Sequence, residues 1–422
     1  MREPQVAYVG MTHLGLCSAA AAASRGFNTL GFDLDPALVG RLDAGRLPIV
    51  EPGLDELIAG NRSRLAFSSD AARLSDCQVI YVSPDVPTNE HGQSDLSGIE
   101  RLLAVALSAA AANAVIVVLS QVPPGFTRNR QRDGVLLLYQ VETLVFGRAV
   151  ERAVSPERII VGWDDPSRAL PDALRAFLEA FECPILPMRF ESAELAKISI
   201  NCCLVASVSV ANTLAEICER VGADWSEIAP ALKLDRRIGS HAYLTPGLGI
   251  GGGNLERDLA TVDELSRANG TEAGVIRSFV ANSSHRKNWA IRVLHERLLA
   301  DVTDVRIGVL GLAYKEDTAS IKNSPSIALL RLLEPWPVQV YDPAVEATVP
   351  LPARASRTAT ALEAARGADA LAIMTPWAEF RKLEAGTLRS AMRGRLVLDP
   401  FRVLDRRAVL AAGLDHRTLG VN

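Results

Sequence analysis

The chain has 422 residues, more than one hydrophobic core usually serves, so we expect two or three domains. Its 45 basic and 49 acidic residues leave a net charge of -4, which argues against a nucleic-acid partner and a membrane surface. The six cysteines show no C-x-x-C or zinc-like spacing, which argues against a disulfide scaffold or a metal site and indicates a reducing compartment.

The start of the chain has no positively charged segment followed by an apolar stretch, so we expect no signal peptide and a cytoplasmic protein. One uncharged run, Leu102 to Val122, is long enough for a membrane span by length alone. It divides into a helical half, Leu102 to Ala111, and a β-branched half, Ala114 to Leu119. Because an α/β unit has this pattern, we expect no membrane segment.

Strand-like apolar runs alternate with helical stretches over the first 190 residues, and this alternation predicts a parallel sheet. The expected strands are Val6 to Val9, Thr29 to Phe32, Val79 to Ser83, Val115 to Leu119 and Ile159 to Val161.

A single helical stretch follows from about Glu191 to Val221, with no Gly or Pro to interrupt it. A helix of about thirty residues spans about 45 Å, too long for one small domain to cover, so we expect it to join two lobes and to pair with its twin in a homodimer.

After a Gly-rich segment and more helix, strand-like runs return and predict a second α/β domain. Ser324-Pro325 is a predicted helix start, with a serine cap and a proline at the first helical position. The fold class is therefore α/β, with two Rossmann-like, doubly wound parallel-sheet domains joined by a long central helix. The expected strands of the second sheet are Arg306 to Leu310, Val338 to Tyr341, Ala370 to Met374 and Leu396 to Leu398.

The first strand runs into a turn, Gly10 to Gly15, that is similar to the G-x-G-x-x-G dinucleotide turn, with Thr12 in place of the middle glycine. Asp33 ends the next strand 23 residues after Gly10, near the offset of a ribose-binding carboxylate. An acid there repels a 2′-phosphate, which favours NAD over NADP. The alternative is a tight turn that holds no ligand. The cofactor residues predicted here are Gly10, Thr12, His13, Leu14, Gly15 and Asp33.

Further short motifs follow in a fixed order. They are Glu51 to Leu54 (E-P-G-L), Ser120 to Gly125 (S-Q-V-P-P-G), Glu194 with Lys197 and Asn201 (E-x-x-K-x-x-x-N), Arg237 to Gly239 (R-I-G), Gly311 to Lys315 with Thr318, Ser324-Pro325, and Tyr341 to Pro343. In this order and spacing they resemble the UDP-glucose and GDP-mannose dehydrogenase family, over nearly the whole chain.

The resemblance implies an NAD-binding domain at 1–190, a central helical dimerisation segment with an active-site loop at 191–300, and a C-terminal nucleotide-sugar-binding domain at 301–422. It implies NAD as cofactor and a UDP- or GDP-linked sugar as substrate. In such enzymes C6 of the sugar is oxidised twice, and the second oxidation passes through a cysteine thioester.

The family's block around that cysteine is similar to Pro246 to Asp258, where the glycines and the final aspartate are present and Asn254 occupies the cysteine position. A carboxamide is a poor nucleophile, so no thioester can form on it. Gln121 replaces a threonine, Phe146 the second of two glutamates of which Glu142 is the first, and Lys322 an arginine.

The resemblance assigns the remaining site residues. Lys197 and Asn201 lie at i and i+4 on one helical face, whereas Cys202 and Cys203 point away from it, so neither cysteine is expected to replace the missing one. Lys197 could instead be a solvated lysine, Asn201 a buried polar link and Asp258 a helix cap. Arg237 and Lys315 could instead form surface ion pairs. The catalytic set is Lys197, Asn201, Asp258, Asn254 and Glu142, the further cofactor residues are Ser83, Ser120 and Lys322, and the substrate residues are Arg237, Gly251, Gly252 and Lys315.

We therefore predict an NAD-dependent dehydrogenase that oxidises the C6 alcohol of a nucleotide sugar, most simply a UDP-hexose, to the aldehyde. Three further hypotheses stay open: full four-electron oxidation through a hydrated aldehyde, a non-catalytic NAD- or nucleotide-sugar-binding homologue, and a hydroxyacid dehydrogenase of related design, which the second α/β domain disfavours. Arg257 favours the UDP-glucose and GDP-mannose branch over the N-acetyl-sugar enzymes.

Overall fold

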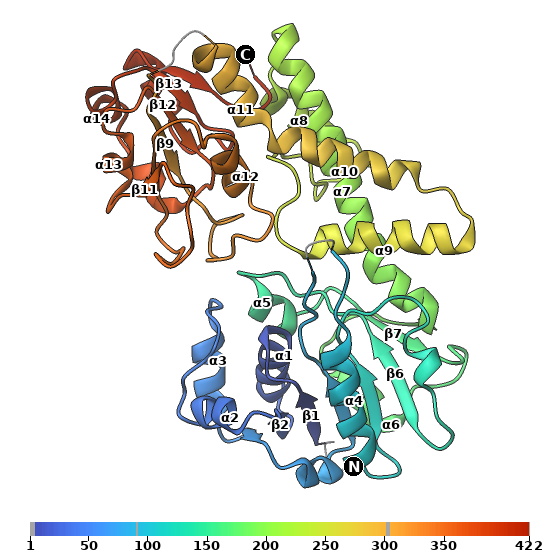
Figure 1. The fold of residues 1–422 in the computed structure, drawn as a ribbon. Helices are drawn as coiled ribbons and strands as arrows, with labels where there is room; N and C mark the ends of the chain where they lie inside the picture. The colour runs from blue at the N-terminus through green and yellow to red at the C-terminus, as the bar shows by residue number, and fades with distance from the viewer. Residues whose placement is uncertain (1–4, 90–91, 301–303, 422) are drawn as a thin grey trace. The chain divides into compact units, whose positions relative to one another are not determined.

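The computed structural model describes residues 5–89, 92–300 and 304–421 and forms two compact units, Met1–Ile200 and Asn201–Asn422 (Figure 1). Residues 1–4, on which the expectation of no signal peptide partly depends, lie outside the described part. Each unit is built around one sheet, so the predicted fold class of two Rossmann-like domains and a long central helix is confirmed.

The first unit has an eight-stranded sheet in the order β3-β2-β1-β4-β5-β6-β7-β8. β1 lies between β2 and β4, so Val6 is in register with both Thr29 and Val79. The carboxyl ends of these central strands therefore meet at one edge, where ligands bind in folds of this kind. The strands are β1 (Val6–Val9), β2 (Thr29–Phe32), β3 (Leu65–Ser68), β4 (Val79–Val82), β5 (Val115–Val118), β6 (Leu136–Gln140), β7 (Ile159–Trp163) and β8 (Ile185–Arg189).

The expectation that this sheet is parallel throughout is wrong at one pair, because β6 and β7 run antiparallel, with Tyr139 opposite Gly162. The chain between them contains only the six-residue helix α5, which packs on α1 and does not serve as a crossover helix.

Helices cover both faces of this sheet. Leu16 and Phe177 belong to the apolar core on one face, and Leu102 and Phe190 to the core on the other. The uncharged run from Leu102 to Val122 is divided between α4 and β5, as predicted. The helices are α1 (His13–Ser24), α2 (Pro36–Asp43), α3 (Leu54–Gly60), η1 (Ala71–Asp76), α4 (Ser97–Ala109), η2 (Arg128–Arg130), α5 (Ala149–Val154) and α6 (Asp172–Glu179).

The long central helix α7 (Phe190–Val221) has 32 residues and begins within one residue of its predicted start. It is long and apolar enough by composition to cross a membrane, since its most apolar stretch has a mean hydropathy of 1.6, and only 33% of that stretch is buried. The helix also carries buried Glu194 and Lys197. The expectation of no membrane segment stays a prediction.

The second unit contains a wholly parallel six-stranded sheet in the order β11-β10-β9-β12-β13-β14. Ser324 caps α12 as predicted, since its hydroxyl accepts the Ser326 N–H at 3.2 Å. The strands are β9 (Ile307–Leu310), β10 (Val338–Tyr341), β11 (Ala355–Arg357), β12 (Ala370–Ile373), β13 (Leu396–Leu398) and β14 (Asp415–Arg417). The helices after α7 are α8 (Trp225–Leu234), α9 (Asn254–Asn269), α10 (Gly274–Lys287), α11 (Trp289–Leu294), η3 (His295–Leu299), α12 (Pro325–Leu332), α13 (Ala361–Ala365), η4 (Ala378–Lys382), α14 (Ala385–Ala391) and α15 (Arg406–Ala411).

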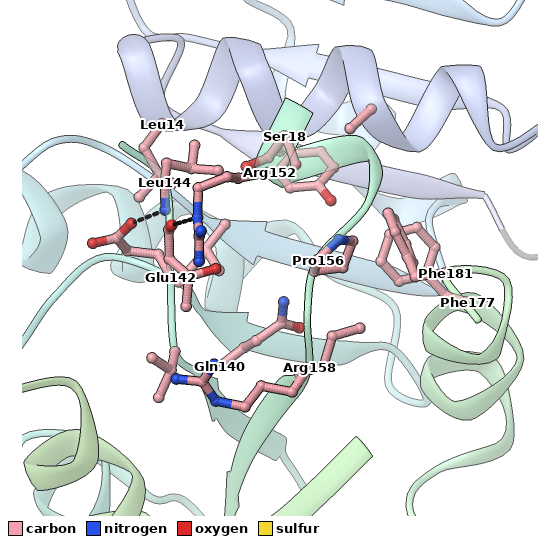
Figure 2. Close-up of a pocket in the computed structure, with 17 residues that line it drawn as sticks. Leu14, Ser18, Gln140, Glu142, Leu144, Arg152, Pro156, Arg158, Phe177 and Phe181 are labelled. Atoms are coloured by element: carbon pink, nitrogen blue, oxygen red, sulfur yellow. Dashed lines mark hydrogen bonds between the residues drawn. The ribbon is translucent and has the colours of Figure 1, made fainter. Parts of the chain in front are cut away.

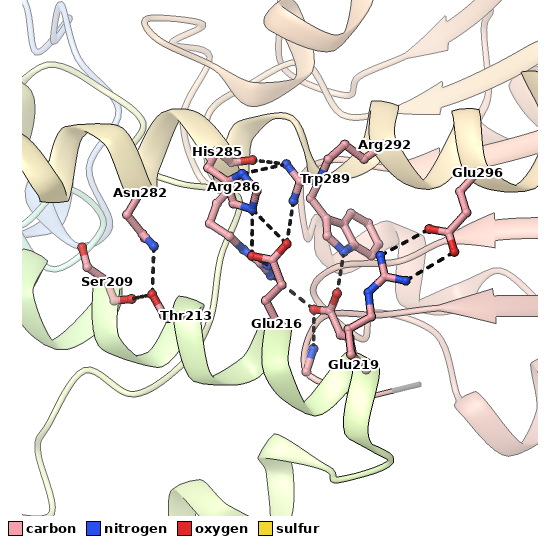
Figure 3. A network of polar contacts seen from close by, with 12 residues as sticks. Ser209, Thr213, Glu216, Glu219, Asn282, His285, Arg286, Trp289, Arg292 and Glu296 are labelled. Carbon is pink, nitrogen blue, oxygen red and sulfur yellow. Dashed lines mark hydrogen bonds and ion pairs between the residues drawn. The ribbon is translucent and has the colours of Figure 1, made fainter.

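A network of charged side chains joins α7 to α10 and α11 (Figure 3). Arg286, which is 0% exposed, lies 3.1 Å from Glu216 and 3.3 Å from Glu219. Glu219 also accepts the Trp289 indole N–H at 3.2 Å and the Gly420 backbone N–H at 3.0 Å. A buried guanidinium is tolerated only when it is paired, so these carboxylates fix how the helices pack.

Candidate active site

The glycine turn after β1 requires both of its glycines. Gly10 has a φ of +102°, and a Cβ there would lie 3.0 Å from the Pro84 nitrogen. A Cβ on Gly15 would lie only 1.9 Å from the Gly10 carbonyl oxygen, so α1 can approach β1 this closely only with glycine at that position.

Asp33 lies at the carboxyl end of β2 and faces this turn. One carboxylate oxygen accepts the Met11 N–H at 2.8 Å and the other accepts the Asp35 N–H at 3.0 Å. The turn and the carboxylate thus lie together at the edge where a dinucleotide binds in a doubly wound sheet.

His13 is buried at the first position of α1, and its Nε2 lies 2.9 Å from Glu51. Phe146 stacks on the imidazole with 4.2 Å between ring centroids. Glu51 also accepts the backbone N–H groups of Gly147 and Ala149. Burial alone would raise the pKa of Glu51, but the hydrogen bonds from His13 and these amides hold that pKa below its usual range. His13 and Glu51 therefore tie the turn to the 147–149 segment, and this role of Glu51 is one that we did not predict.

Thr12 and Asp85 form a second link at the same turn. The Thr12 hydroxyl accepts the Asp85 backbone N–H at 2.8 Å, and one Asp85 carboxylate oxygen accepts the His13 backbone N–H at 3.0 Å. Sequence reasoning missed Asp85. The available signal was its place two residues after Ser83, just beyond the carboxyl end of the strand that pairs with β1.

The predicted cofactor residues Ser83 and Ser120 are both fully buried, and their hydroxyls donate to backbone carbonyls. The Ser83 hydroxyl reaches Val9 at 3.3 Å, and the Ser120 hydroxyl reaches Pro84 at 2.5 Å. In this structure they hold the strand ends together. Leu14 packs in the apolar core of the first unit.

Lys197 and Glu142 form a buried ion pair, with 2.7 Å between Nζ and Oε1. The other Glu142 oxygen accepts the Leu144 backbone N–H at 2.9 Å (Figure 2). The hypothesis of a solvated lysine at Lys197 is therefore wrong, because its side chain is only 10% exposed. Glu142 also lines a small cavity of about 60 Å³.

Glu194, the first residue of the E-x-x-K motif, is completely buried. Its carboxylate accepts the backbone N–H groups of Gly125 at 2.6 Å and Thr127 at 2.9 Å. Burial raises the pKa of Glu194, and these hydrogen bonds oppose the increase. Glu194 therefore holds the loop of the P-P-G motif against the start of α7.

Asn201 and Asp258 form a second buried pair. The Asn201 amide donates to Asp258 Oδ2 at 2.5 Å, and the other Asp258 oxygen lies 3.3 Å from Arg257 Nε. Asp258 is 1% exposed and lies inside α9, so the hypothesis of a helix cap is wrong. Asn201 does form a buried polar link, with Asp258 as its partner.

The Gly-rich loop leads into α9, whose first residue is Asn254, an exposed side chain. Gly249 has a φ of +83°, and a Cβ there would lie 2.4 Å from the Ser283 carbonyl oxygen. Gly251 and Gly252 pack against the Tyr314 ring, since a Cβ on either would lie 3.1 Å from it. The Gly252 N–H donates to the Lys322 carbonyl at 2.9 Å, so predicted cofactor residue Lys322 adjoins this loop.

A largely apolar cavity of about 230 Å³ lies between α7, this loop and α10. It is lined by Val205, Asn212, Tyr243, Ile250, Asn282 and Tyr314, among others. The two remaining predicted substrate residues lie on loops. Arg237 pairs with Asp235 and its side chain is 88% exposed, and the Lys315 ammonium lies 6.0 Å from the centre of the Tyr314 ring.

All six cysteines are free. Burial, followed by the Asp258 and Cys203 charges, raises the pKa of the Cys202 thiol to about 11. Burial raises the pKa of the Cys17 thiol to about 12. Within residues 5–89, 92–300 and 304–421 no group of three or more His, Cys, Asp or Glu side chains could hold a metal ion.

Three domain models of the UDP-glucose/GDP-mannose dehydrogenase family match the chain: the NAD binding domain at residues 4–182, the central domain at 191–283 and the UDP binding domain at 308–406. The UDP-glucose 6-dehydrogenase AglM of Haloferax volcanii is 31% identical over 98% of this chain and 100% of its own length. The putative UDP-glucose 6-dehydrogenase YtcA of Bacillus subtilis is 28% identical over 97% and 98%.

Among solved structures, a UDP-glucose dehydrogenase from Pyrobaculum islandicum has a TM-score of 0.87 at 27% identity, covering 100% of this chain and 98% of that one. The UDP-D-ManNAc dehydrogenase of Pyrococcus horikoshii has a TM-score of 0.84 at 23% identity over 99% of each chain, and shows the shared fold.

Fold, motifs and matches together define an NAD-dependent oxidoreductase that acts on nucleotide sugars. The chain belongs to the UDP-glucose/GDP-mannose dehydrogenase family. The residues of the glycine turn fit NAD in one respect, because the required glycines and the Asp33 carboxylate lie together at the sheet edge. In a second respect these residues fit NAD less well, because the Asp85 carboxylate already accepts the His13 N–H, the first amide of α1.

Proposed function

We propose that the chain oxidises the C6 primary alcohol of a UDP-hexose to the aldehyde with NAD and stops at this two-electron stage. The observation that carries the proposal is Asn254, an exposed side chain that follows the glycine loop directly, at the position where the resemblance places the family's cysteine. Relatives named as UDP-glucose 6-dehydrogenases support the choice of sugar nucleotide.

The first oxidation needs a base and a hydride acceptor. The C6 hydroxyl loses its proton to a base and C6 loses a hydride to NAD, so the products are an aldehyde, NADH and one proton. A second hydride can leave only after the aldehyde carbon becomes tetrahedral again, and a sulfur nucleophile would normally accomplish this. The Asn254 side chain has no sulfur atom.

The remaining catalytic set suits the first oxidation. Lys197, held by Glu142, presents a positive charge for the oxygen that loses its proton, and Asp258, held by Asn201, offers a carboxylate as acceptor. Lys197 and Asn201 lie one turn apart on α7 and share a helical face.

No cysteine takes the place of the missing one in this proposal. Cys202 follows Asn201 directly, but its high pKa keeps it a thiol near neutral pH, and only a thiolate attacks a carbonyl efficiently. Cys17 is completely buried inside α1.

The cofactor and substrate residues are assigned as predicted. We place NAD along Gly10, Thr12, His13, Leu14, Gly15 and Asp33, with Ser83, Ser120 and Lys322 as further cofactor residues. We place the nucleotide sugar on Gly251, Gly252, Arg237 and Lys315. The cavity of about 230 Å³ supports this placement, since Gly251 lines it together with Tyr314, the ring against which Gly252 packs.

We also propose a homodimer, with α7 in the interface. Four exposed apolar side chains, Val210, Leu214, Ile217 and Val221, are 40–68% exposed and recur at spacings of four, three and four residues along α7. This spacing forms one stripe on a helix, and a stripe of this kind suits a second copy. We further propose a cytoplasmic location, which the free state of all six cysteines supports. The proposed domains are residues 1–190, 191–300 and 301–422.

Counting reduced cofactor per sugar tests the reaction. Purified protein is incubated with NAD and a limiting UDP-, GDP- or TDP-sugar, NADH is measured by absorbance, and the product is identified by mass. One NADH and an aldehyde support the proposal. Two NADH and a uronic acid support four-electron oxidation through the hydrate, and no NADH with any sugar supports a non-catalytic binding protein.

A further inference from the structure

The first turn of α1 lacks a cap of its own. Thr12 precedes the helix, yet its side chain makes no capping hydrogen bond to the helix amides. The first four amides of any helix need partners from outside the helix, and together they form a site for an anion.

Asp85 supplies the missing anion. One of its oxygens accepts the His13 N–H at 3.0 Å. The main chain of Asp85 is held in place by its N–H bond to the Thr12 hydroxyl at 2.8 Å. Because Asp85 comes from the loop after β4, this cap is brought from 72 residues away in the sequence.

These amides are the ones that a dinucleotide pyrophosphate contacts in a strand-turn-helix motif of this kind. A carboxylate and a pyrophosphate cannot accept from the same N–H groups, and two anions at hydrogen-bonding distance repel each other. Asp85 is an exposed residue, so its side chain has room to rotate away from the helix, and burial of the carboxyl group in its present position raises the pKa of that group.

We propose that Asp85 is a stand-in for the cofactor's pyrophosphate: it caps α1 when the turn is free, and NAD binds only by displacing it. This inference rests on the placement of NAD at the glycine turn proposed above. Asp85 thus lowers the affinity for NAD while stabilising the unliganded turn.

A purely structural role and this competition make opposite predictions for one variant. If Asp85 only shapes the turn, Asp85→Ala lowers both the stability of the free protein and the affinity for NAD. If Asp85 competes, Asp85→Ala lowers the thermal midpoint without NAD but raises the affinity, because the amides become free and a like charge is removed.

Isothermal titration of the whole protein with NAD, at one pH and physiological salt, measures the affinity, and thermal unfolding without NAD measures the stability. We expect Asp85→Ala and Asp85→Asn to bind NAD about ten-fold more tightly, since removing a negative charge close to the pyrophosphate changes the dissociation constant by about a factor of ten. Asp70→Asn is the matched control, because it removes an exposed aspartate that caps η1 in the same unit and leaves α1 intact. It is expected to leave the NAD affinity unchanged.

Asp33→Asn separates the two ways in which the inference can fail. Weaker NAD binding in Asp33→Asn, together with unchanged or weaker binding in both Asp85 variants, overturns the competition but keeps the cofactor at the turn. If the Asp33 and Asp85 variants all bind NAD with the parent affinity, the result contradicts both the proposed placement of NAD and this inference.

Discussion

Lys197 and Glu142 form an ion pair in which Nζ lies 2.7 Å from Oε1, and their side chains are only 10% and 15% exposed. The Leu144 N–H holds the second oxygen of Glu142, so the carboxylate cannot rotate away from the lysine. An ammonium held this way still has two N–H donors for other partners. The pair therefore orients a positive charge beside α7.

Removing that charge tests its catalytic role. Lys197→Met is expected to lower kcat by about 10²-fold, because a fixed charge that stabilises developing negative charge contributes about this much. Glu142→Gln is expected to cost less, since the amide oxygen can still accept from Lys197. Arg175→Met, which breaks an exposed pair with Asp172, is the control and should leave kcat unchanged. A Lys197→Met enzyme with the parent kcat would contradict the assignment.

A cysteine introduced at position 254 tests the proposed stop at the two-electron stage. Asn254→Cys is expected to produce a second NADH per sugar and some uronic acid, because a thiol at this position can convert the aldehyde to a tetrahedral adduct. Asn254→Ala is the control and should yield no more than one NADH. The idea fails if the parent enzyme and Asn254→Ala both produce acid.

The pKa of Cys202 predicts how this thiol responds to pH. Because the pKa is raised to about 11, the reactive thiolate is scarce at pH 7 to 9, and its fraction increases towards pH 11. In a Cys203→Ser background, alkylation of Cys202 by iodoacetamide, followed by peptide mass, should accelerate with pH over this range. Cys202→Ser should keep the parent rate and one NADH per sugar. A loss of turnover in this variant would make Cys202 a participant in the reaction.

The Arg286 network predicts a large effect on stability. Arg286→Met leaves Glu216 and Glu219 without their central cation, and breaking a buried pair costs about 3 kcal/mol. Arg220→Met is the control, because Arg220 and Glu296 form an exposed pair, and such pairs contribute less than about 1 kcal/mol. Urea unfolding followed by tryptophan fluorescence compares the two variants, since Trp289 donates to Glu219. Equal midpoints would show that the network does not stabilise the helices.

The apolar stripe on α7 predicts an effect on assembly. Leu214→Glu and Ile217→Glu place charges within the stripe and are expected to convert the proposed dimer to a monomer, as measured by sedimentation velocity. Leu410→Glu is the control, since Leu410 is similarly exposed on α15, outside the stripe. A parent protein that is already monomeric at micromolar concentration would contradict the proposed dimer.

Much of the fold could be predicted because buried strands leave a clear pattern. Val6–Val9 and Val115–Val118 are completely buried and rich in β-branched residues, and α7 contains no Gly or Pro from end to end. β3, β8, β11 and β14 escaped prediction because they are edge strands, where polar residues such as Arg189 and Asp415 are tolerated, and β6 also escaped although it lies inside its sheet.

The geometry of the candidate site could be predicted only where local structure sets the spacing of residues along the chain. Lys197 and Asn201 are recognisable because one helical turn separates them, and Gly10 and Gly15 because a tight turn requires them. The contacts of Asp85 and Glu51 could not be found this way, since each reaches His13 across a separation set by the pairing and packing of distant elements.

The bond from the Gly420 N–H to Glu219 sets a limit on how the chain can be divided. The Trp225 backbone N–H donates to the Gly420 carbonyl at 2.8 Å, and a Cβ on Gly420 would lie 2.7 Å from the Trp225 side chain. The last described residues therefore pack closely against α7 and α8. A fragment beginning at residue 301 would lose these partners and expose the apolar surface that they cover. An independently expressible C-terminal piece must therefore begin at or before the second half of α7.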